Sequence, residues 1–211
     1  MIHNLKPTPQ ELSNKISLVK NNLVNKAFNK VDRKLFVPKQ YAALAYSDIP
    51  ISLDGDSSIS QPSLVAEMID LLELTGKEHV LEIGTASGYS AAILSYCCRK
   101  LDTIEINPRL AKTAKVRLKS LGYGNITVHI GDGALGLPSK APFEAIVVTA
   151  AVEQIPSALI EQLKNGGRIV VPIGGINASD MQQLVVGLKK GDKLITKSVN
   201  TVKFVPLVSG E

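Results

Sequence analysis

Glycines and carboxylates recur at three points of the chain in a pattern that could hold a nucleoside. Gly84 and Gly88 follow a short apolar run in VLEIGTASGYS, and Asp132 lies between two glycines further along. Glu105 ends the next apolar run roughly twenty residues after Gly84, where a carboxylate can accept hydrogen bonds from two ribose hydroxyls. Each feature alone also fits an ordinary turn or a solvated strand end. The three together predict a nucleoside-binding site.

The glycine spacing narrows the kind of ligand. A pyrophosphate on a helix N-terminus requires the pattern G-x-G-x-x-G, whereas this chain reads E-I-G-T-A-S-G from Glu82. The carboxylate of Glu82 disfavours a pyrophosphate and suits a cation. Electrostatics therefore favours S-adenosylmethionine, which carries a sulfonium and an ammonium but no phosphate, over NAD.

Hydroxyl groups are concentrated in DSSISQPS, residues 56–63. Two interpretations of Ser60 stay open. It can be a helix N-cap, because Gln-Pro and an apolar helical pattern follow it. It can also hold a reacting group, and the two roles are compatible because a helix N-terminus favours an anion.

The elements that must position these residues alternate between helix and strand. Helices are expected at 61–74, 88–99, 108–121 and 156–164, and strands at 79–84, 101–106, 125–131, 143–151 and 166–174. Several of the strands are apolar almost throughout, which is typical of parallel strands covered on both faces. We therefore predict an α/β fold with a Rossmann-like, doubly wound, mostly parallel sheet. Segments 181–190 and 201–208, with Gly191-Asp192 between them, are expected to close it as an antiparallel hairpin.

The N-terminal part has a different pattern. Residues 8–30 have helical periodicity, and 31–60 are irregular but contain enough apolar side chains for an ordered wrap over a core. We expect a single domain over residues 1–211. Residues 1–60 form an N-terminal helical and active-site lead, and 61–211 form the α/β core.

Composition argues against several classes of partner. The net charge is +5, but the lysines are spread along the chain, so we expect no nucleic-acid partner. No apolar segment reaches the length of a membrane span or of a signal peptide, which favours a cytoplasmic protein without a membrane partner. The adjacent Cys97 and Cys98 fit buried thiols, and the scattered histidines predict no metal site.

The motifs also resemble the protein-L-isoaspartate O-methyltransferase family. The most specific are ISQP (59–62), TAA (149–151) and VPL (205–207), and the likeness extends over nearly the whole chain. It implies a class I methyltransferase fold, S-adenosylmethionine as cofactor, and isoaspartyl-containing proteins and peptides as substrates. It leaves the oligomeric state open.

The resemblance also assigns candidate site residues. It implies that the methionine portion of the cofactor is held by Glu82, Gly84, Thr85, Ser87 and Gly88, the ribose by Glu105, and the adenine by Asp132 and Gly133. It places the reaction at Ile59-Ser60, where the α-carboxylate of the substrate attacks the sulfonium methyl group. Ser60 would donate a hydrogen bond to that carboxylate, Ser58 would supply a second hydroxyl, and Ile59 would contact the substrate.

This methyl transfer depends more on correct positioning of the reacting atoms than on a general base. A carboxylate with a pKa near 4 is already ionised at neutral pH. Holding oxygen, methyl and sulfur in line can contribute about 7–11 kcal/mol.

Departures from the family pattern keep other functions open. Asp54 and Asp56 replace loop glycines and would repel an acceptor carboxylate unless they face solvent or a lysine. Ala86 stands where the family usually has glycine, and its methyl group could crowd the cofactor. The alternatives are a methyltransferase for a different acceptor and a catalytically inactive cofactor-binding homologue. An NAD-linked oxidoreductase is opposed by the glycine spacing and by Glu82.

Overall fold

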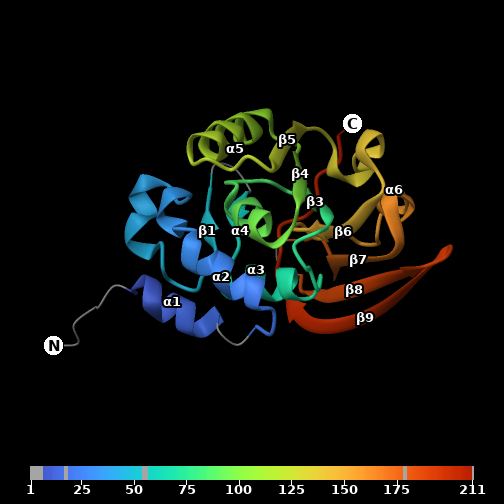
Figure 1. Ribbon diagram of the computed structural model, residues 1–211, viewed down its shortest axis with the longest axis horizontal. Coiled ribbons are helices and arrows are strands. Elements are labelled where there is room, and N and C mark those ends of the chain that lie inside the picture. The colour runs from blue at the N-terminus through green and yellow to red at the C-terminus, as the bar shows by residue number, and fades with distance from the viewer. Residues whose placement is uncertain (1–6, 17–18, 54–56, 178–179, 211) are drawn as a thin grey trace.

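The structure, a computed structural model, describes residues 7–16, 19–53, 57–177 and 180–210. Within these residues a central sheet has the strand order β5-β4-β3-β6-β7-β8-β9 (Figure 1). Its strands are β3 (His79–Ile83), β4 (Lys100–Glu105), β5 (Ile126–Ile130), β6 (Phe143–Val148), β7 (Leu163–Gly174), β8 (Gln182–Lys190) and β9 (Lys193–Val202). Neighbours from β5 to β7 are parallel, and β8 and β9 extend the sheet with antiparallel pairing.

Helices cover both faces of this sheet. They are α1 (Pro9–Ile16), α2 (Asn22–Lys30), α3 (Pro62–Asp70), α4 (Tyr89–Cys97), α5 (Pro108–Ser120) and α6 (Ser157–Gln162). A first hydrophobic cluster joins α1 to α5 with one face, and a second joins α6 with the other. Val80 belongs to the first cluster and Leu81 to the second, as alternation along a strand covered on both faces requires.

Short elements complete the chain between the helices. They are the 3-10 helices η1 (Arg33–Leu35), η2 (Lys39–Leu44), η3 (Gly133–Leu135) and η4 (Pro138–Lys140), and the two-residue strands β1 (Ile51–Ser52) and β2 (Ser58–Ile59). Four of them lie in the stretch 31–60 that the sequence marks as irregular.

The predicted α/β fold is confirmed, and two element predictions need correction. The helical region 8–30 is two helices, because Asn21 ends the connection between them and starts α2. The Asn21 side chain accepts a hydrogen bond from the Leu23 backbone N–H at 2.9 Å, and the Asn21 backbone N–H donates to Asp70 Oδ1 at 2.7 Å.

The prediction of a hairpin strand at 201–208 is wrong. The strand that pairs with β8 is β9, which starts at Lys193, directly after Gly191-Asp192. Most of β9 is exposed and polar, so its sequence lacks the apolar run that marks the buried strands. The apolar residues beyond Val202 leave the sheet instead and cross to the ends of other strands.

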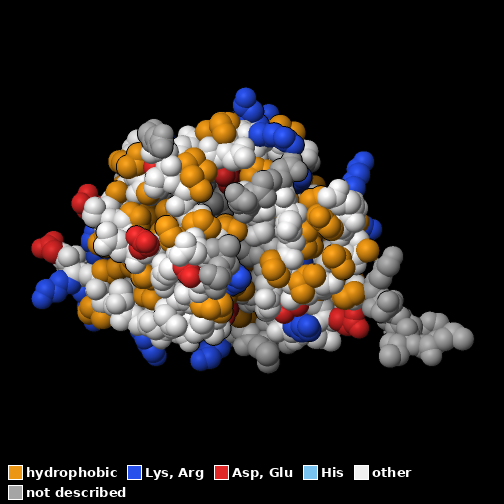
Figure 2. Space-filling view, turned by 180° about the vertical axis from the view of Figure 1, so that it is seen from behind, with side chains coloured by type: hydrophobic (Ala, Val, Ile, Leu, Met, Phe, Trp, Pro, Cys, Tyr) orange, Lys and Arg blue, Asp and Glu red, His pale blue; other side chains and the backbone are white. Residues whose placement is uncertain are grey.

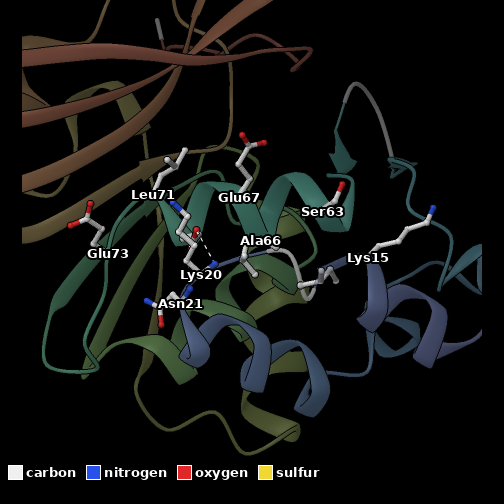
Figure 3. A pocket seen from close by; sticks show the side chains of 11 residues that line it. Lys15, Lys20, Asn21, Ser63, Ala66, Glu67, Leu71 and Glu73 are labelled. Atoms are coloured by element: carbon white, nitrogen blue, oxygen red, sulfur yellow. Dashed lines mark hydrogen bonds between the residues drawn. The ribbon is translucent and has the colours of Figure 1, made fainter.

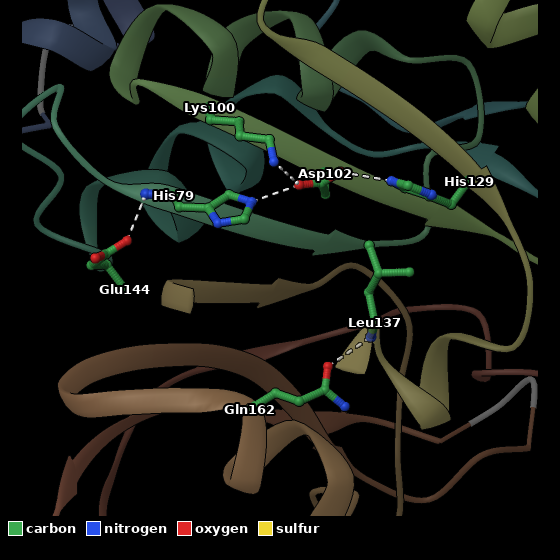
Figure 4. A network of polar contacts seen from close by, with 7 residues as sticks. All are labelled: His79, Lys100, Asp102, His129, Leu137, Glu144 and Gln162. Carbon is green, nitrogen blue, oxygen red and sulfur yellow. Dashed lines mark hydrogen bonds and ion pairs between the residues drawn. The ribbon is translucent and has the colours of Figure 1, made fainter. Parts of the chain in front are cut away.

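Asp102 is a buried carboxylate that ties three strands together. It pairs with Leu81 and so lies on the face of the second cluster. Its two oxygens accept hydrogen bonds from His79 Nε2 on β3 at 2.5 Å and from His129 Nε2 on β5 at 2.7 Å (Figure 4). Lys100 Nζ lies 3.3 Å from the same carboxylate. Burial alone would raise the pKa of Asp102, but the hydrogen bonds from these three side chains lower it below its ordinary value.

This network predicts an acid-sensitive contribution to stability. The lowered pKa means that the carboxylate stabilises the fold above its ordinary pKa, and that this is lost as pH falls through the folded-state pKa. We expect Asp102→Asn to lower the free energy of unfolding at pH 7 by about 1–3 kcal/mol. Urea unfolding should show this deficit shrinking below about pH 4. The exposed Asp192→Asn is the control, and a pH-independent deficit would contradict the assignment.

Glu82 is a second buried carboxyl group, on the face opposite Asp102. It is 0% exposed, and Thr103 on β4 donates a hydrogen bond to its Oε2 at 2.7 Å. Its Oε1 has no hydrogen-bond partner among the described residues. Burial raises the pKa of Glu82 to about 7, the hydroxyls of Thr103 and Ser90 oppose the shift, and the nearby charge of Glu105 adds to it. Near neutral pH a large part of the protein therefore carries Glu82 in its protonated form.

A raised pKa has the opposite consequence for stability. Between the ordinary carboxyl pKa of 4.5 and about 7 the folded protein binds more protons than the unfolded chain, so stability falls as pH rises through this window. We expect Glu82→Gln to remove that fall, with a difference from wild type that grows by up to about 3 kcal/mol between pH 4.5 and pH 8. Unfolding of the cofactor-free protein measures it, with the exposed Glu161→Gln as control. Parallel curves for wild type and Glu82→Gln would refute the shift.

Candidate active site

A cavity of about 1050 Å³ opens where β3, β4 and β6 end. Because β3 lies between β4 and β6, the chain leaves it toward one side of the sheet and returns on the other. In doubly wound sheets this reversal creates the crevice in which ligands bind. The predicted site residues that line the cavity are Ser58, Ile59, Ser60, Gly84, Thr85, Ser87, Glu105 and Gly133.

Three predicted site residues do not line the cavity. Gly88 is the left-handed N-cap of α4. Glu82 is buried behind the turn, and Asp132 accepts backbone hydrogen bonds from Ala134 at 2.8 Å and from Gly210 at 3.0 Å. These residues support the lining from outside it. Asp54 and Asp56, whose charges were expected to bear on the acceptor, lie outside the described residues.

The turn after β3 brings backbone to the cavity wall. Gly84 has φ +98°, and a Cβ there would lie 2.3 Å from Thr149 Oγ1. That hydroxyl is 2.9 Å from the carbonyl of Ile83 and 3.0 Å from that of Gly84. Glycine is therefore required at 84 by both conformation and space. Ala86 also has a positive φ, 47°, so this turn holds alanine in a conformation that glycine adopts more easily.

A chain of hydroxyls orients the Thr85 side chain. Thr103 donates its hydrogen to Glu82 while that carboxyl is ionised. A hydroxyl has one hydrogen, so Thr85 must then donate to Thr103, whose oxygen is 2.7 Å away. The buried carboxyl thus sets the direction of a hydroxyl on the cavity wall.

Glu105 is held rigidly at the end of β4. Its Oε2 accepts a hydrogen bond from the Ala86 N–H at 2.8 Å, and its Oε1 accepts one from the Asn107 N–H at 3.0 Å. The side chain is largely buried but lines the cavity. Each carboxylate oxygen can accept a second hydrogen bond, so the group can still receive two hydroxyl donors.

The serine hydroxyls are aimed by the burial of their neighbours. In the hairpin of β1 and β2, Ile51 pairs with Ile59 and Ser52 with Ser58, and both isoleucines are buried. Successive side chains of an extended chain point to opposite sides. Ser58 and Ser60 flank Ile59, and both reach the cavity.

Ser60 does not cap the helix that follows it. The N-cap of α3 is Gln61, which makes no side-chain capping bond. Asp48 takes that role from the irregular stretch, because its Oδ1 accepts a hydrogen bond from the Ser63 N–H at 2.9 Å and its Oδ2 accepts one from Gln61 Nε2 at 3.2 Å. The Ser60 hydroxyl makes no hydrogen bond with the described residues, so it remains available to a ligand.

The C-terminal tail is a part of the wall that the sequence did not reveal. Beyond β9 it runs beside the segment that follows β6. The Ala151 N–H donates to the Val205 carbonyl at 2.8 Å, and the Leu207 N–H donates to the Ala151 carbonyl at 2.7 Å. Phe204 and Leu207 line the cavity. The TAA and VPL motifs were the available signal, but neither shows in sequence that the two segments meet.

Thr149 and Tyr89 are also lining residues that sequence reasoning missed. Thr149 is the hydroxyl that packs against Gly84. Tyr89 was included in a helix start without a role, and its ring packs against Phe36 with the centroids 5.7 Å apart.

The charge of the lining suits a cationic ligand. Among the residues that the structure describes, the charged side chains of the lining are Glu67, Glu105 and Lys203. Within that part of the lining, one lysine is the basic group that a pyrophosphate could use. In the view from behind, hydrophobic side chains spread over much of the face and most lysines and arginines lie toward its margins (Figure 2).

A second hollow, of about 810 Å³, lies beside α3 and shares Ser63 and Glu67 with the cavity. Its walls come from α3, from the end of α1 and from residues 19–21, which directly precede α2 (Figure 3). Of its three acidic lining residues, Glu67, Asp70 and Glu73, Asp70 accepts hydrogen bonds from the backbone N–H groups of Lys20 and Asn21. None of the predicted site residues lies in this hollow.

In the part of the chain that the structure describes, no three or more His, Cys, Asp and Glu side chains are grouped to hold a metal ion. None of the helices found there combines the length and apolarity that a membrane span needs.

Comparison with known proteins gives one consistent result. Residues 10–211 match the family model "Protein-L-isoaspartate(D-aspartate) O-methyltransferase (PCMT)". Protein-L-isoaspartate O-methyltransferase 2 of Shewanella sediminis (strain HAW-EB3) is 47% identical over 90% of this chain and 77% of that protein. Protein-L-isoaspartate O-methyltransferase of Roseiflexus sp. (strain RS-1) is 43% identical over 91% of this chain and 87% of that protein.

Solved structures agree with the sequence relatives. A protein-L-isoaspartate O-methyltransferase structure superposes with a TM-score of 0.87 at 30% identity, covering 96% of this chain and 66% of that longer chain. A putative enzyme of that name from Plasmodium falciparum, solved in complex with S-adenosyl-L-homocysteine, has the same fold, with a TM-score of 0.80 at 19% identity over 98% of this chain and 100% of that one. The family match over most of the chain and the identity to these relatives establish that this chain belongs to the protein-L-isoaspartate(D-aspartate) O-methyltransferase family.

Proposed function

We propose that this protein transfers a methyl group from S-adenosylmethionine to the α-carboxylate of L-isoaspartyl residues in damaged proteins and peptides. The observation that carries the proposal is that one cavity contains the unbonded hydroxyl of Ser60, the Gly84 turn and the carboxylate of Glu105. Family membership and the names of the relatives support the same reaction.

The residues present fit this cofactor. Glu105 has free acceptor positions for two ribose hydroxyls, and the Gly84 backbone lines the cavity at a place where a side chain would collide with Thr149. We assign Gly84, Thr85 and Ser87 to the methionine portion of the cofactor and Gly133 to the adenine, and Gly88 to the support of that turn from outside the cavity as the N-cap of α4. Glu82 and Asp132 would act by holding Thr85 and the start of η3 in place. When bound, S-adenosylmethionine supplies a methyl group activated by its positively charged sulfur.

The acceptor requires orientation. Its carboxylate is ionised near neutral pH, so the chain needs no general base, and no histidine or cysteine lines the described cavity. Transfer of the methyl group from the sulfonium to the carboxylate oxygen would leave both the acceptor and the sulfur neutral. Loss of charge is favoured in a cavity with few charged groups.

We assign the positioning of the acceptor to the serine segment. The Ser60 hydroxyl would donate a hydrogen bond to one carboxylate oxygen, and Ser58 would supply a second donor. Ile59 would contact the substrate backbone. Burial of Ile51 and Ile59 keeps this segment in one orientation. A bound acceptor would therefore be held with its carboxylate oxygen aligned for methyl transfer.

The first test is substrate choice. Incubated with labelled S-adenosylmethionine, the protein should form base-labile methyl ester on an isoaspartyl peptide and not on its aspartyl isomer. Equal labelling, or none, would refute the proposed acceptor. Continued stabilisation of the protein by S-adenosylhomocysteine would then indicate a methyltransferase for another acceptor.

Ser60→Ala tests the hydroxyl. We expect kcat/KM for the isoaspartyl peptide to fall by about 10- to 100-fold, the equivalent of one hydrogen bond to a charged group. Thermal stabilisation by S-adenosylhomocysteine should be unchanged. Ser139→Ala, an exposed serine on η4, should behave as wild type. Full activity of Ser60→Ala would remove Ser60 from the mechanism.

Glu105→Gln tests the ribose assignment. The amide keeps the shape of the side chain but offers one acceptor oxygen instead of two and no charge. We expect the Kd for S-adenosylhomocysteine, measured by calorimetry, to rise by about 10- to 100-fold. Peptide KM should change little at saturating cofactor, and Glu161→Gln serves as control. An unchanged Kd would refute the assignment.

A further inference from the structure

Arg33 is a buried cation that contacts the catalytic segment from behind. It is 1% exposed. Its Nη1 donates hydrogen bonds to the carbonyls of Ala45, at 3.3 Å, and Ser47, at 2.8 Å. Its Nη2 donates to the carbonyls of Ile49, at 2.9 Å, and Ser60, at 3.2 Å. One side chain thus joins the irregular stretch before β1 to the residue proposed to orient the acceptor.

This arrangement depends on the shape of guanidinium. Four carbonyls accept from its two terminal nitrogens, and the fifth N–H group, on Nε, has no partner among the described residues. A lysine ammonium carries three donors on one atom and cannot span four carbonyls in this way. The position of the Ser60 peptide is therefore tied to an arginine in particular.

The charge of Arg33 is not cancelled by a contact ion pair. No carboxylate lies within salt-bridge distance of it in the described part of the chain. Asp48 interacts with it electrostatically, but the Asp48 oxygens are engaged by Gln61 and Ser63. The face of the Tyr89 ring lies 5.5 Å from the guanidinium carbon. Burial lowers the pKa of Arg33, yet arginine stays charged at neutral pH.

A purely structural tie does not need a charge at this place. Backbone N–H groups or a neutral side chain could satisfy the same carbonyls without the desolvation that a buried cation requires. A fixed positive charge directly behind Ser60 is useful if the ligand in front of Ser60 is an anion. The acceptor in the proposed reaction is a carboxylate.

We propose that Arg33 is a positioning residue for methyl transfer, which holds the Ser60 peptide so that the hydroxyl meets the acceptor carboxylate, and whose charge favours binding of that anion. This inference rests on the proposed function. It assigns Arg33 an action through Ser60, without contact with the reacting atoms.

Steady-state kinetics of five proteins test it: wild type, Arg33→Lys, Arg33→Gln, Ser60→Ala and the double variant Arg33→Lys/Ser60→Ala. We expect Arg33→Lys to lower kcat about 10-fold or more, with affinity for S-adenosylhomocysteine within about two-fold of wild type. Arg33→Gln, which also removes the charge, should in addition raise the KM of the isoaspartyl peptide. Arg168→Lys, on the surface ion pair with Glu73, is the matched control and should leave both constants unchanged.

The double variant separates positioning from general structural support. If Arg33 acts through Ser60, adding Arg33→Lys to Ser60→Ala should cost less than about two-fold in kcat. The same loss in both backgrounds would overturn the proposal, as would wild-type kcat in Arg33→Lys. If the wild-type protein is inactive, the proposed function and this inference both fail. If the wild-type protein is active and substitution of Arg33 leaves kcat unchanged, the inference alone fails.

A measurement on the unsubstituted protein covers the case in which Arg33→Lys fails to fold and does not bind S-adenosylhomocysteine. The buried guanidinium N–H groups of Arg33 should give slowly exchanging signals in nitrogen-15 NMR spectra. With S-adenosylhomocysteine present, adding the isoaspartyl peptide should shift these signals and adding the aspartyl isomer should not. Arg33 signals whose chemical shifts do not change when the isoaspartyl peptide is added would overturn the proposal.

Discussion

The parallel pairing of β3 with β4 on one side and with β6 on the other determines where the groups of this site lie. The three strands end at one edge, so the turn after β3, the carboxylate that ends β4 and the hydroxyl that follows β6 converge on one crevice. Thr149 packs so closely on Gly84 that a side chain at 84 would collide with it. The same geometry leaves the backbone of that turn open toward the cavity. The absence of a side chain at Gly84 thus allows both the close packing of the sheet end and the approach of a ligand.

The acceptor side of the cavity is built differently, from a segment without long elements. Its order comes from two buried isoleucines in a short hairpin and from polar groups that the preceding stretch contributes. Asp48 supplies the helix cap that Ser60 could have supplied. Arg33 donates hydrogen bonds to three backbone carbonyls before the hairpin and to the Ser60 carbonyl after it. Because Asp48 and Arg33 provide the hydrogen bonds that hold this segment in place, the hydroxyl of Ser60 has no hydrogen-bond partner among the described residues.

Buried ionisable groups are distributed unevenly over the sheet. Asp102, on the face away from the first cluster, is surrounded by donors and has a lowered pKa. Glu82, on the other face, accepts a hydrogen bond from Thr103 and lies near the Ser90 hydroxyl, yet burial leaves it with a raised pKa. The first arrangement favours the charged form and strengthens the sheet, whereas the second costs stability in the cofactor-free protein. Glu82 is thus a buried acid behind the turn with too few hydrogen-bond donors. Such a group is typical of a site whose charges favour ligand binding at the expense of fold stability.

The sequence by itself determined the alternation of helix and strand, the parallel character of the sheet and the spacing of Gly84, Glu105 and Asp132, because apolar periodicity and turn chemistry are local properties. It also determined the family, through motifs that reappear in the comparisons. Only the tertiary structure decided that Asp48 and not Ser60 caps α3, that the tail after β9 lines the cavity, and that Arg33 lies behind Ser60. These contacts join residues distant along the chain, and neither periodicity nor local propensity records which distant groups meet when a core is packed.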